Sequence, residues 1–249
     1  MLKYKKPTDL ELIMSEKDLS LTICPIAKIK NDFPTKFGLP RQSGLAASLK
    51  SKIVFEPEYR VAEAIRGIEQ YSHLWLIWGF SETFGEKWSP TVRPPRLGGN
   101  ERLGVFATRA PYRPNPLALS VVKLEGIEKT HEGLVLSVSG ADIMDGSPIY
   151  DIKPYLPYVD AHPDALGGFT DEAKGYKLTV DFPSALLSLI NKESRDALIE
   201  ALECDPRPAY HRSADRIYGL EYSSYEIKFR VEDGVLHVTE VSDRKNCNI

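Results

Sequence analysis

The chain has 249 residues, a net charge of −3 at pH 7, 42% hydrophobic residues and 27% charged residues. These values are ordinary for a globular protein and do not indicate a strongly basic nucleic-acid-binding chain. No apolar run approaches the roughly 18 residues of a membrane-spanning helix, so we expect no membrane segment. The first 19 residues lack the apolar region of a signal peptide. Three widely spaced cysteines (Cys24, Cys204 and Cys247) indicate a reducing compartment and no zinc cluster.

Residues 1–20 are polar and show no periodic pattern, so we expect a loose N-terminal extension. The next stretch, 21–29, alternates towards its end and predicts a first strand, with Pro25 favouring a sheet edge or a bulge. The segment FPTKFGLPRQSGLA (33–46) contains two prolines and two glycines beside Arg41 and Gln42. Such a backbone can approach a ligand closely, although a plain connection would have the same composition.

The following segment predicts a short strand over 51–55, a helix over 58–70 and a buried strand over 73–80. Apolar residues recur with a helical period in 58–70, and HLWLIWGF (73–80) is a continuous apolar run. His73 stands at the start of this run. A histidine in that position can belong to a site, or can simply be a structural hydrogen-bonding residue.

Residues 104–120, GVFATRAPYRPNPLALS, open as an apolar strand over 104–108 and then carry three prolines in six residues. Prolines stiffen this turn and exclude a helix or a central strand. Around it, 93–113 contains five arginines against one glutamate, a local charge of +4. Arginine suits paired contacts with carboxylate or phosphate groups. The segment is therefore either a binding loop or a solvated, arginine-rich surface loop.

Further short strands are expected over 119–127, 134–138 and 149–155, separated by turns at 131–133 and 142–148. Many short strands with glycine and proline turns indicate a mainly β protein. We expect an antiparallel β-barrel or sandwich over residues 21–165.

A smaller α+β domain is expected over residues 166–249, after an exit linker near 160–175. Its elements would be a strand over 177–180, helical segments near 184–190 and 195–203, and a hairpin joining 225–231 to 235–241. Ser194 is suited to cap the second helix. DPRPAYHR (205–212) is another proline-stiffened polar loop.

Several common signatures are missing, including G-x-G-x-x-G, the P-loop, H-E-x-x-H, C-x-x-C and G-x-S-x-G. Asn115-Pro116 is similar to the Asn-Pro pair of adenine-N6 methyltransferases with a doubly wound fold, but the aromatic residue that stacks on the base is absent. Four polar loops remain, at 40–42, 108–116, 145–148 and 205–208. If the β domain brings the first three to one end, they offer groups that suit a small zwitterionic nucleoside.

Five stretches resemble the TrmO (TsaA- or YaeB-like) family of S-adenosylmethionine-dependent tRNA methyltransferases. They are FGLPRQSGLA (37–46), YSHLWLIWGF (71–80), GVFATRAPYRPNPLALS (104–120), DGSPIYDIKPYLPYVD (145–160) and DPRPAYH (205–211). The resemblance implies a β-barrel methyltransferase with S-adenosylmethionine as donor. It also implies N6 of N6-threonylcarbamoyladenosine at tRNA position 37 as acceptor. A homodimer in the cytoplasm is expected.

Motif by motif, the resemblance implies a donor site and no metal site. The donor site would comprise Pro40, Arg41, Gln42, His73, Leu74, Arg109, Leu119, Asp145, Gly146, Ser147 and Pro148. Ser147 and Ala118 depart from the threonine and glycine that are common in the family, and neither removes a group that the donor needs. For the tRNA we expect Arg113, Asn115, Arg207 and Tyr210.

The general base is not identified by the sequence; Tyr112, Tyr210, His211 and water are the candidates. Two other functions stay open at this point. One is an RNA-binding β-barrel module without catalysis, and the other is a methyltransferase of the same fold with a small-molecule acceptor.

Overall fold

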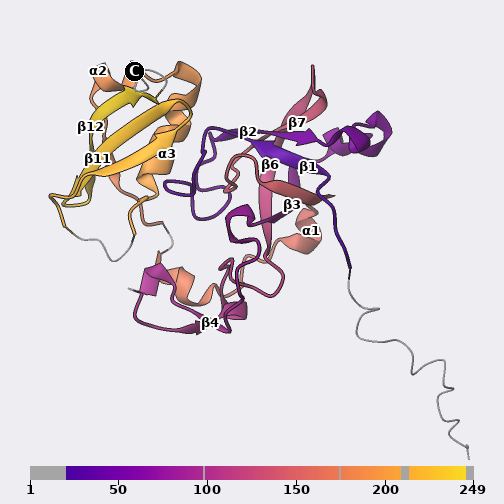
Figure 1. The fold of residues 1–249 in the computed structure, drawn as a ribbon, viewed down its shortest axis with the longest axis horizontal. Coiled ribbons are helices and arrows are strands. Elements are labelled where there is room, and N and C mark those ends of the chain that lie inside the picture. Colours follow the sequence, from indigo (N-terminus) through magenta and orange to yellow (C-terminus); the bar gives the residue numbers. More distant parts are fainter. Residues whose placement is uncertain (1–20, 98, 174, 209–212, 245–249) are drawn as a thin grey trace, which may run out of the picture.

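The computed structural model describes residues 21–97, 99–173, 175–208 and 213–244, which form two parts joined through loops (Figure 1). One part is a ring of six strands, and the other is a four-stranded sheet with short helices on it. A long segment between β3 and β6, which contains β4, extends away from both parts. The prediction of a mainly β protein with few helices is confirmed.

The ring closes because its last strand pairs with its first. Its strands are β1 (Ala27–Lys30), β2 (Lys50–Phe55), β3 (His73–Gly79), β6 (Leu117–Thr130), β7 (Gly133–Ser139) and β8 (Pro148–Pro154). They are hydrogen-bonded in the order β1-β2-β7-β6-β3-β8, and β8 pairs back with β1. Every pair is antiparallel, so strand direction alternates around the ring.

The interior of the ring is filled by alternate side chains of its strands, as the two-residue period of a strand requires. Ile53, Leu74, Leu76, Leu136 and Ile149 are each 0% exposed. The expectation of a continuously buried strand over 73–80 was wrong in one respect, because β3 alternates between buried and half-buried residues. Its outer face is covered by local contacts: the Trp75 indole donates a 2.9 Å hydrogen bond to Asp160 and lies 5.7 Å from the Tyr155 ring.

The second part pairs β10 (Tyr218–Tyr222), β11 (Tyr225–Glu232) and β12 (Val235–Asp243) in antiparallel order, with β9 (Thr179–Asp181) parallel to β12. The predicted hairpin and the helix over 195–203 are confirmed. α2 spans Ser184–Leu187 and α3 spans Arg195–Glu203, where Leu198 and Leu202 are fully buried. Ser194 precedes α3 but does not cap it. Its hydroxyl donates to Asp32 at 3.1 Å instead.

The loop between β1 and β2 joins the two parts. Three of its residues pack into the hydrophobic core of the second part, namely Phe33, Ala46 and Leu49. The Phe33 ring lies 5.0 Å from the Tyr222 ring in an edge-to-face arrangement. The two parts therefore share buried apolar surface, and the loop over 31–49 is held from both sides.

Two local predictions were wrong. The expected helix over 58–70 is three 3₁₀ turns, η2 (Pro57–Tyr59), η3 (Ala62–Ile65) and η4 (Ile68–Gln70). Gly67 interrupts them with a φ of 88°, which is a left-handed conformation that favours glycine. The strand expected over 104–108 ends after β5 (Leu103–Gly104), which pairs with β4 (Thr91–Val92). A 3₁₀ turn, η7 (Val105–Ala107), follows it.

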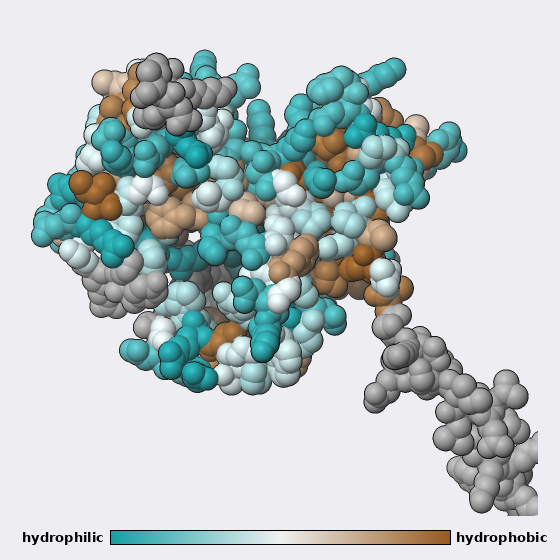
Figure 2. All heavy atoms as spheres, in the orientation of Figure 1, coloured by the Kyte–Doolittle hydropathy of each residue, from teal (hydrophilic) through white to brown (hydrophobic). Residues whose placement is uncertain are grey.

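The remaining short elements connect these parts. They are η5 (Ser81–Thr83), η6 (Pro95–Leu97), α1 (Pro157–Asp160), η8 (Gly168–Ala173) and η9 (Lys192–Ser194). The first strand begins at Ala27 rather than at 21. Within the described ranges, no helix is long and apolar enough to cross a membrane. The face in Figure 2 is mostly hydrophilic, with hydrophobic residues in separate patches.

Candidate functional site

Three of the four polar loops lie at one end of the ring, which we call the rim. Because strand direction alternates, the carboxyl ends of β1, β3 and β7 point the same way. The loops that follow these strands are 31–49, 80–116 and 140–147. They carry Arg41, Arg109 and Asp145, so the topology brings these three predicted donor-site residues to the same end.

Direct contact between the first two of these loops comes from Gln42. The Arg109 guanidinium donates a hydrogen bond from Nη1 to Oε1 of Gln42. The Gln42 amide in turn donates from Nε2 to the backbone oxygen of Arg41 at 2.5 Å. The arginine and the amide are thus fixed side by side, where they can bind the carboxylate of a ligand together.

The first and third loops are tied through their backbones and Asn31. Gly44 N donates to the Gly140 oxygen at 2.8 Å, and Asn31 Nδ2 donates to the Ile143 oxygen at 2.8 Å. Asp145 accepts a 2.9 Å bond from the backbone N–H of Asn31 on Oδ1. One carboxylate oxygen of Asp145 is therefore used to hold the rim together.

In the motif Gly146-Ser147-Pro148, the backbone is more accessible to a ligand than the side chains are. Gly146 is exposed and has a φ of 76°, whereas Ser147 and Pro148 are buried at the entry to β8. The Ser147 oxygen accepts a bond from Ile29 N at 3.2 Å. Pro40, at the start of the first motif, is buried as well.

The fourth loop, from the second part of the protein, docks on Arg41. Nη2 of Arg41 donates to the backbone oxygen of Arg207 at 2.8 Å and to that of Asp205 at 3.4 Å. Asp205 has a φ of 53°, which turns the chain sharply here. The Arg207 side chain forms a two-pronged ion pair with Asp205, at 2.8 and 2.9 Å, with both side chains about 15% exposed. The Arg207 charge is thus neutralised within its own loop.

Asp142 is a rim residue that was not among the predicted site residues. Its Oδ1 accepts a 2.5 Å bond from the Ser120 hydroxyl, which accepts a 2.9 Å bond from the Trp78 indole. Loss of solvent raises the pKa of the Asp142 carboxyl, while the Ser120 hydrogen bond and the nearby Arg109 charge act in the opposite direction. Asp142 therefore joins β3 and β6 to the rim beside Arg109.

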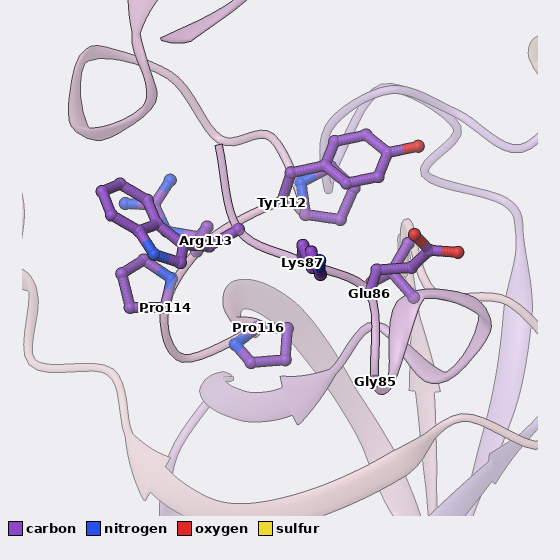
Figure 3. Close-up of a pocket in the computed structure, with 10 residues that line it drawn as sticks. Gly85, Glu86, Lys87, Tyr112, Arg113, Pro114 and Pro116 are labelled. Carbon is purple, nitrogen blue, oxygen red and sulfur yellow. The ribbon is translucent and has the colours of Figure 1, made fainter. Parts of the chain in front are cut away.

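The segment 80–116, which we call the excursion, folds back on itself. Its two limbs enclose a pocket of about 350 Å³ next to the ends of β3 and β6. Figure 3 shows Tyr112 and Glu86 on one flank, Arg113 and Pro114 on the other, and Lys87 between them. Arg113 donates from Nη1 to the backbone oxygens of Val105 and Thr108, at 3.1 and 2.7 Å. Its guanidinium therefore helps to shape the loop.

Other predicted site residues take no part in these rim contacts. His73 begins β3 at the opposite end, and its Nδ1 contacts the Ser72 hydroxyl at 2.9 Å. Leu74 is fully buried in the ring core, and Leu119 is 50% exposed on β6. Asn115 is exposed on the excursion. Tyr210 and His211 lie outside the described residues.

Two family models match the chain. They are the tRNA-methyltransferase O N-terminal domain, over residues 28–161, and the TrmO C-terminal domain, over residues 175–244. Together these models span most of the sequence and include all four polar loops. No site residue was predicted in 162–174, the gap between the two models.

Individual proteins agree with the family models. A tRNA (adenine(37)-N6)-methyltransferase of Escherichia coli K12 is 37% identical over 227 residues, which cover 88% of this chain and 97% of that protein. A Pseudomonas aeruginosa protein named "Putative S-adenosylmethionine-dependent methyltransferase RcsF" is 40% identical over 207 residues, covering 80% and 87%. A crystal structure of TrmO from Pseudomonas aeruginosa matches with a TM-score of 0.74 and 32% identity, covering 90% of this chain and 98% of that one. The chain therefore belongs to the tRNA-methyltransferase O (TrmO) family.

Proposed function

We propose that this protein transfers a methyl group from S-adenosylmethionine to N6 of the adenosine at position 37 of tRNA. The contact that carries the proposal is the one between Gln42 and Arg109, which joins two separate family motifs at the rim. The E. coli relative is named as a tRNA (adenine(37)-N6)-methyltransferase, and the P. aeruginosa relative is named as S-adenosylmethionine-dependent. Within this function, the acceptor we propose is N6-threonylcarbamoyladenosine.

The rim has the chemistry that the donor requires. S-adenosylmethionine presents a carboxylate, an ammonium group, a ribose and an adenine. Arg41 and Arg109 suit the carboxylate, because guanidinium groups form paired charged hydrogen bonds. Asp142 and Asp145 supply negative charge for the ammonium group or oxygen acceptors for the ribose. We propose that Pro40, Gln42, Gly146, Ser147 and Pro148 complete this site, together with His73, Leu74 and Leu119.

The architecture fits this assignment. We interpret the closed six-stranded ring as the β-barrel of the methyltransferase domain, over 21–165, and 166–249 as the small α+β domain. Residues 1–20 would be an extension. We propose that the enzyme works as a cytoplasmic homodimer. His73 lies at the opposite end of β3, seven residues before the start of the excursion, and this location favours a site completed by a second subunit.

The chemical step would be a direct in-line displacement. When bound, S-adenosylmethionine supplies an electrophilic methyl group, so that the protein mainly has to position the acceptor nitrogen against it. Arg41, Gln42 and Arg109 would orient the donor, and the excursion would orient the base. The acceptor nitrogen loses a proton during transfer. Tyr112 and, outside the described residues, Tyr210 and His211 are the side chains proposed near that proton, with water as the alternative.

The test is transfer of radiolabelled methyl groups to tRNA, followed by digestion and nucleoside analysis. We expect the label in methylated N6-threonylcarbamoyladenosine from position 37. Donor binding measured by calorimetry, with no transfer to any tRNA, would exclude this function. Label found only in small molecules from a cell extract would favour a methyltransferase with a different acceptor.

A further inference from the structure

The pocket of the excursion is built from rigid parts. Two backbone hydrogen bonds join its limbs, from Ser89 N to the Tyr112 oxygen at 3.2 Å and from Phe80 N to the Pro116 oxygen at 3.1 Å. Three of its lining residues are prolines, whose rings fix the backbone φ angle before any ligand binds. A volume of about 350 Å³ lies in the range of pockets for small ligands or single bases.

Aromatic side chains stand exposed at this pocket. Trp88 is 52% exposed and Tyr112 is 44% exposed, and both line it. Phe84 and Phe106, on the same excursion, are 48% and 73% exposed. Exposed aromatic rings next to a cavity are the usual platform on which proteins stack unpaired bases of RNA loops.

The charge of the excursion favours an anionic partner. Residues 81–116 contain six basic and three acidic residues, a net charge of +3, in a chain whose net charge is −3. The rest of the protein therefore carries −6. A local cationic surface of this kind attracts phosphate and carboxylate groups in spite of the overall charge.

Within the pocket, Lys87 is the cation that is available to a ligand. Arg113 donates to two backbone oxygens, and its guanidinium lies 5.7 Å from the Phe106 ring. For Lys87, by contrast, the described residues provide no ion pair, and its side chain lies between the two flanks (Figure 3). Glu86, the acidic residue of the pocket, can accept a hydrogen bond from a ligand N–H or hydroxyl.

We propose that this pocket receives the acceptor base itself, N6-threonylcarbamoyladenine, turned out of the anticodon loop. Trp88 and Tyr112 stack on its rings, and the ammonium group of Lys87 pairs with the carboxylate of its threonyl group. This inference rests on the proposed function, and it assigns the carboxylate contact to Lys87 rather than to Arg113, which was expected to contact the tRNA. The pocket adjoins the rim, since Tyr112 follows Arg109 by three residues, so the base nitrogen and the donor meet at one end of the ring.

The first experiment measures binding of the free nucleoside N6-threonylcarbamoyladenosine by calorimetry, with adenosine as the comparison. We expect Lys87→Ala to weaken binding of the modified nucleoside about tenfold or more and to leave adenosine binding unchanged. Lys87→Arg should restore most of the affinity, because it restores the charge. Lys129→Ala, an exposed lysine of β6 next to the turn at the opposite end of the ring, is the matched control.

The second experiment compares methyl transfer to tRNA that contains the modified base. Trp88→Ala should lower kcat/KM about tenfold while Trp88→Phe keeps most of it, and calorimetry with S-adenosylmethionine should show unchanged donor binding in both. Wild-type rates in Lys87→Ala and Trp88→Ala would overturn the pocket assignment and leave the proposed function intact. If the wild type binds the modified nucleoside through Lys87 but methylates no tRNA, the proposed function fails and the pocket stands.

Discussion

Nη2 of Arg41 lies 2.8 Å from the backbone oxygen of Arg207, and this hydrogen bond joins a loop of the ring to a loop of the second part. The two residues are 166 positions apart in the sequence. Both come from stretches that resemble the family. Arg41 thus has two possible tasks, since it can bind the donor and it holds the loop at 205–208 against the rim.

Replacing Arg41 should affect both tasks. We expect Arg41→Ala to weaken S-adenosylmethionine binding about 10- to 100-fold, in keeping with the loss of a charged hydrogen bond. Hydrogen exchange in 204–208 should become faster, because the loop loses its anchor. Arg66→Ala, on the connection at the opposite end of the ring, is the control. Unchanged affinity together with unchanged exchange would contradict both tasks.

The contact between Gln42 and Arg109 predicts coupling between two motifs that are 67 residues apart. If they act as one unit on the donor, the effects of Gln42→Ala and Arg109→Ala on binding free energy should not add. A double-mutant cycle by calorimetry should give a coupling of about 1 kcal/mol. Simple additivity would mean that the two side chains act on the donor separately.

Asp142 predicts a particular dependence of stability on pH. Burial raises the pKa of its carboxyl in the folded protein, whereas the unfolded chain keeps the ordinary value of about 3.9. The stabilising contribution is therefore complete below that ordinary value and is lost as pH rises through the folded pKa. Relative to Asp142→Asn, the wild type should lose unfolding free energy as pH rises above about 4.

Urea unfolding of both proteins between pH 4 and pH 7 measures this difference. Asp164→Asn, at an exposed position of the connecting segment, is the matched control. A difference between the wild type and Asp142→Asn that stays constant over the whole range would show that burial does not perturb this carboxyl.

Strand positions were predictable from the sequence because alternation is a local property. The hairpin of β11 and β12 is an example, since Asp233 and Gly234 mark its turn and buried residues alternate along both strands. The prediction of a helix over 58–70 was wrong because its apolar residues, although spaced with a helical period, are not all buried on one face. Val61 is 49% exposed, and Ile65 is the one buried residue of η3.

The loops of the site were visible in the sequence as separate motifs, but their contacts were not. The hydrogen bond between Arg109 and Gln42 depends on how the ring closes, which no local pattern specifies. Asp142 could not be predicted as a site residue for the same reason, because its carboxylate is held in position by a hydrogen bond from Ser120 on β6. The sequence also did not show that Arg113 bonds to the backbone oxygens of Val105 and Thr108, because these contacts depend on how the excursion folds. Arg113 was therefore predicted to bind the tRNA.

Arg207 and Arg113 were both expected to contact the tRNA, and the structure separates the consequences of removing them. Arg207→Ala removes the ion pair with Asp205 but keeps the backbone oxygen that Arg41 uses. We therefore expect donor affinity to be preserved. Single-turnover methylation should fall by roughly 10²-fold, because the loop proposed to contact the tRNA loses the ion pair that fixes its shape, a charged contact of about 3 kcal/mol.

Arg113→Ala should instead loosen the excursion, since two backbone oxygens lose their donor, and its effect should extend to thermal stability. The measurement compares the methylation rates of the wild type, Arg207→Ala and Arg113→Ala on tRNA with and without the threonylcarbamoyl group. Equal rates of the wild type on both tRNAs would mean that the carboxylate is not recognised at all.

The last prediction concerns assembly. His73 and Arg109 belong to opposite ends of the ring. β3 alone places about 20 Å between His73 and Gly79, the last residue before the excursion, at roughly 3.3 Å per residue. Among the described residues, no hydrogen bond or ion pair joins His73 to the Gln42–Arg109 contact. If both ends serve one donor, His73 of the partner subunit would complete the site in a closed two-fold dimer.

Sedimentation at micromolar concentration should therefore show a dimer, and mixing two inactive variants should restore activity. In a homodimer of either variant, His73→Ala or Arg109→Ala, both sites lack one of the two residues. A mixed dimer, however, contains one site with both residues intact. After subunit exchange in equal amounts, we expect roughly a quarter of the wild-type activity, since about half of the dimers are mixed and each has one of two sites. No recovery in a mixture shown to contain mixed dimers would place both residues in the same subunit, and a monomer would exclude the shared site altogether.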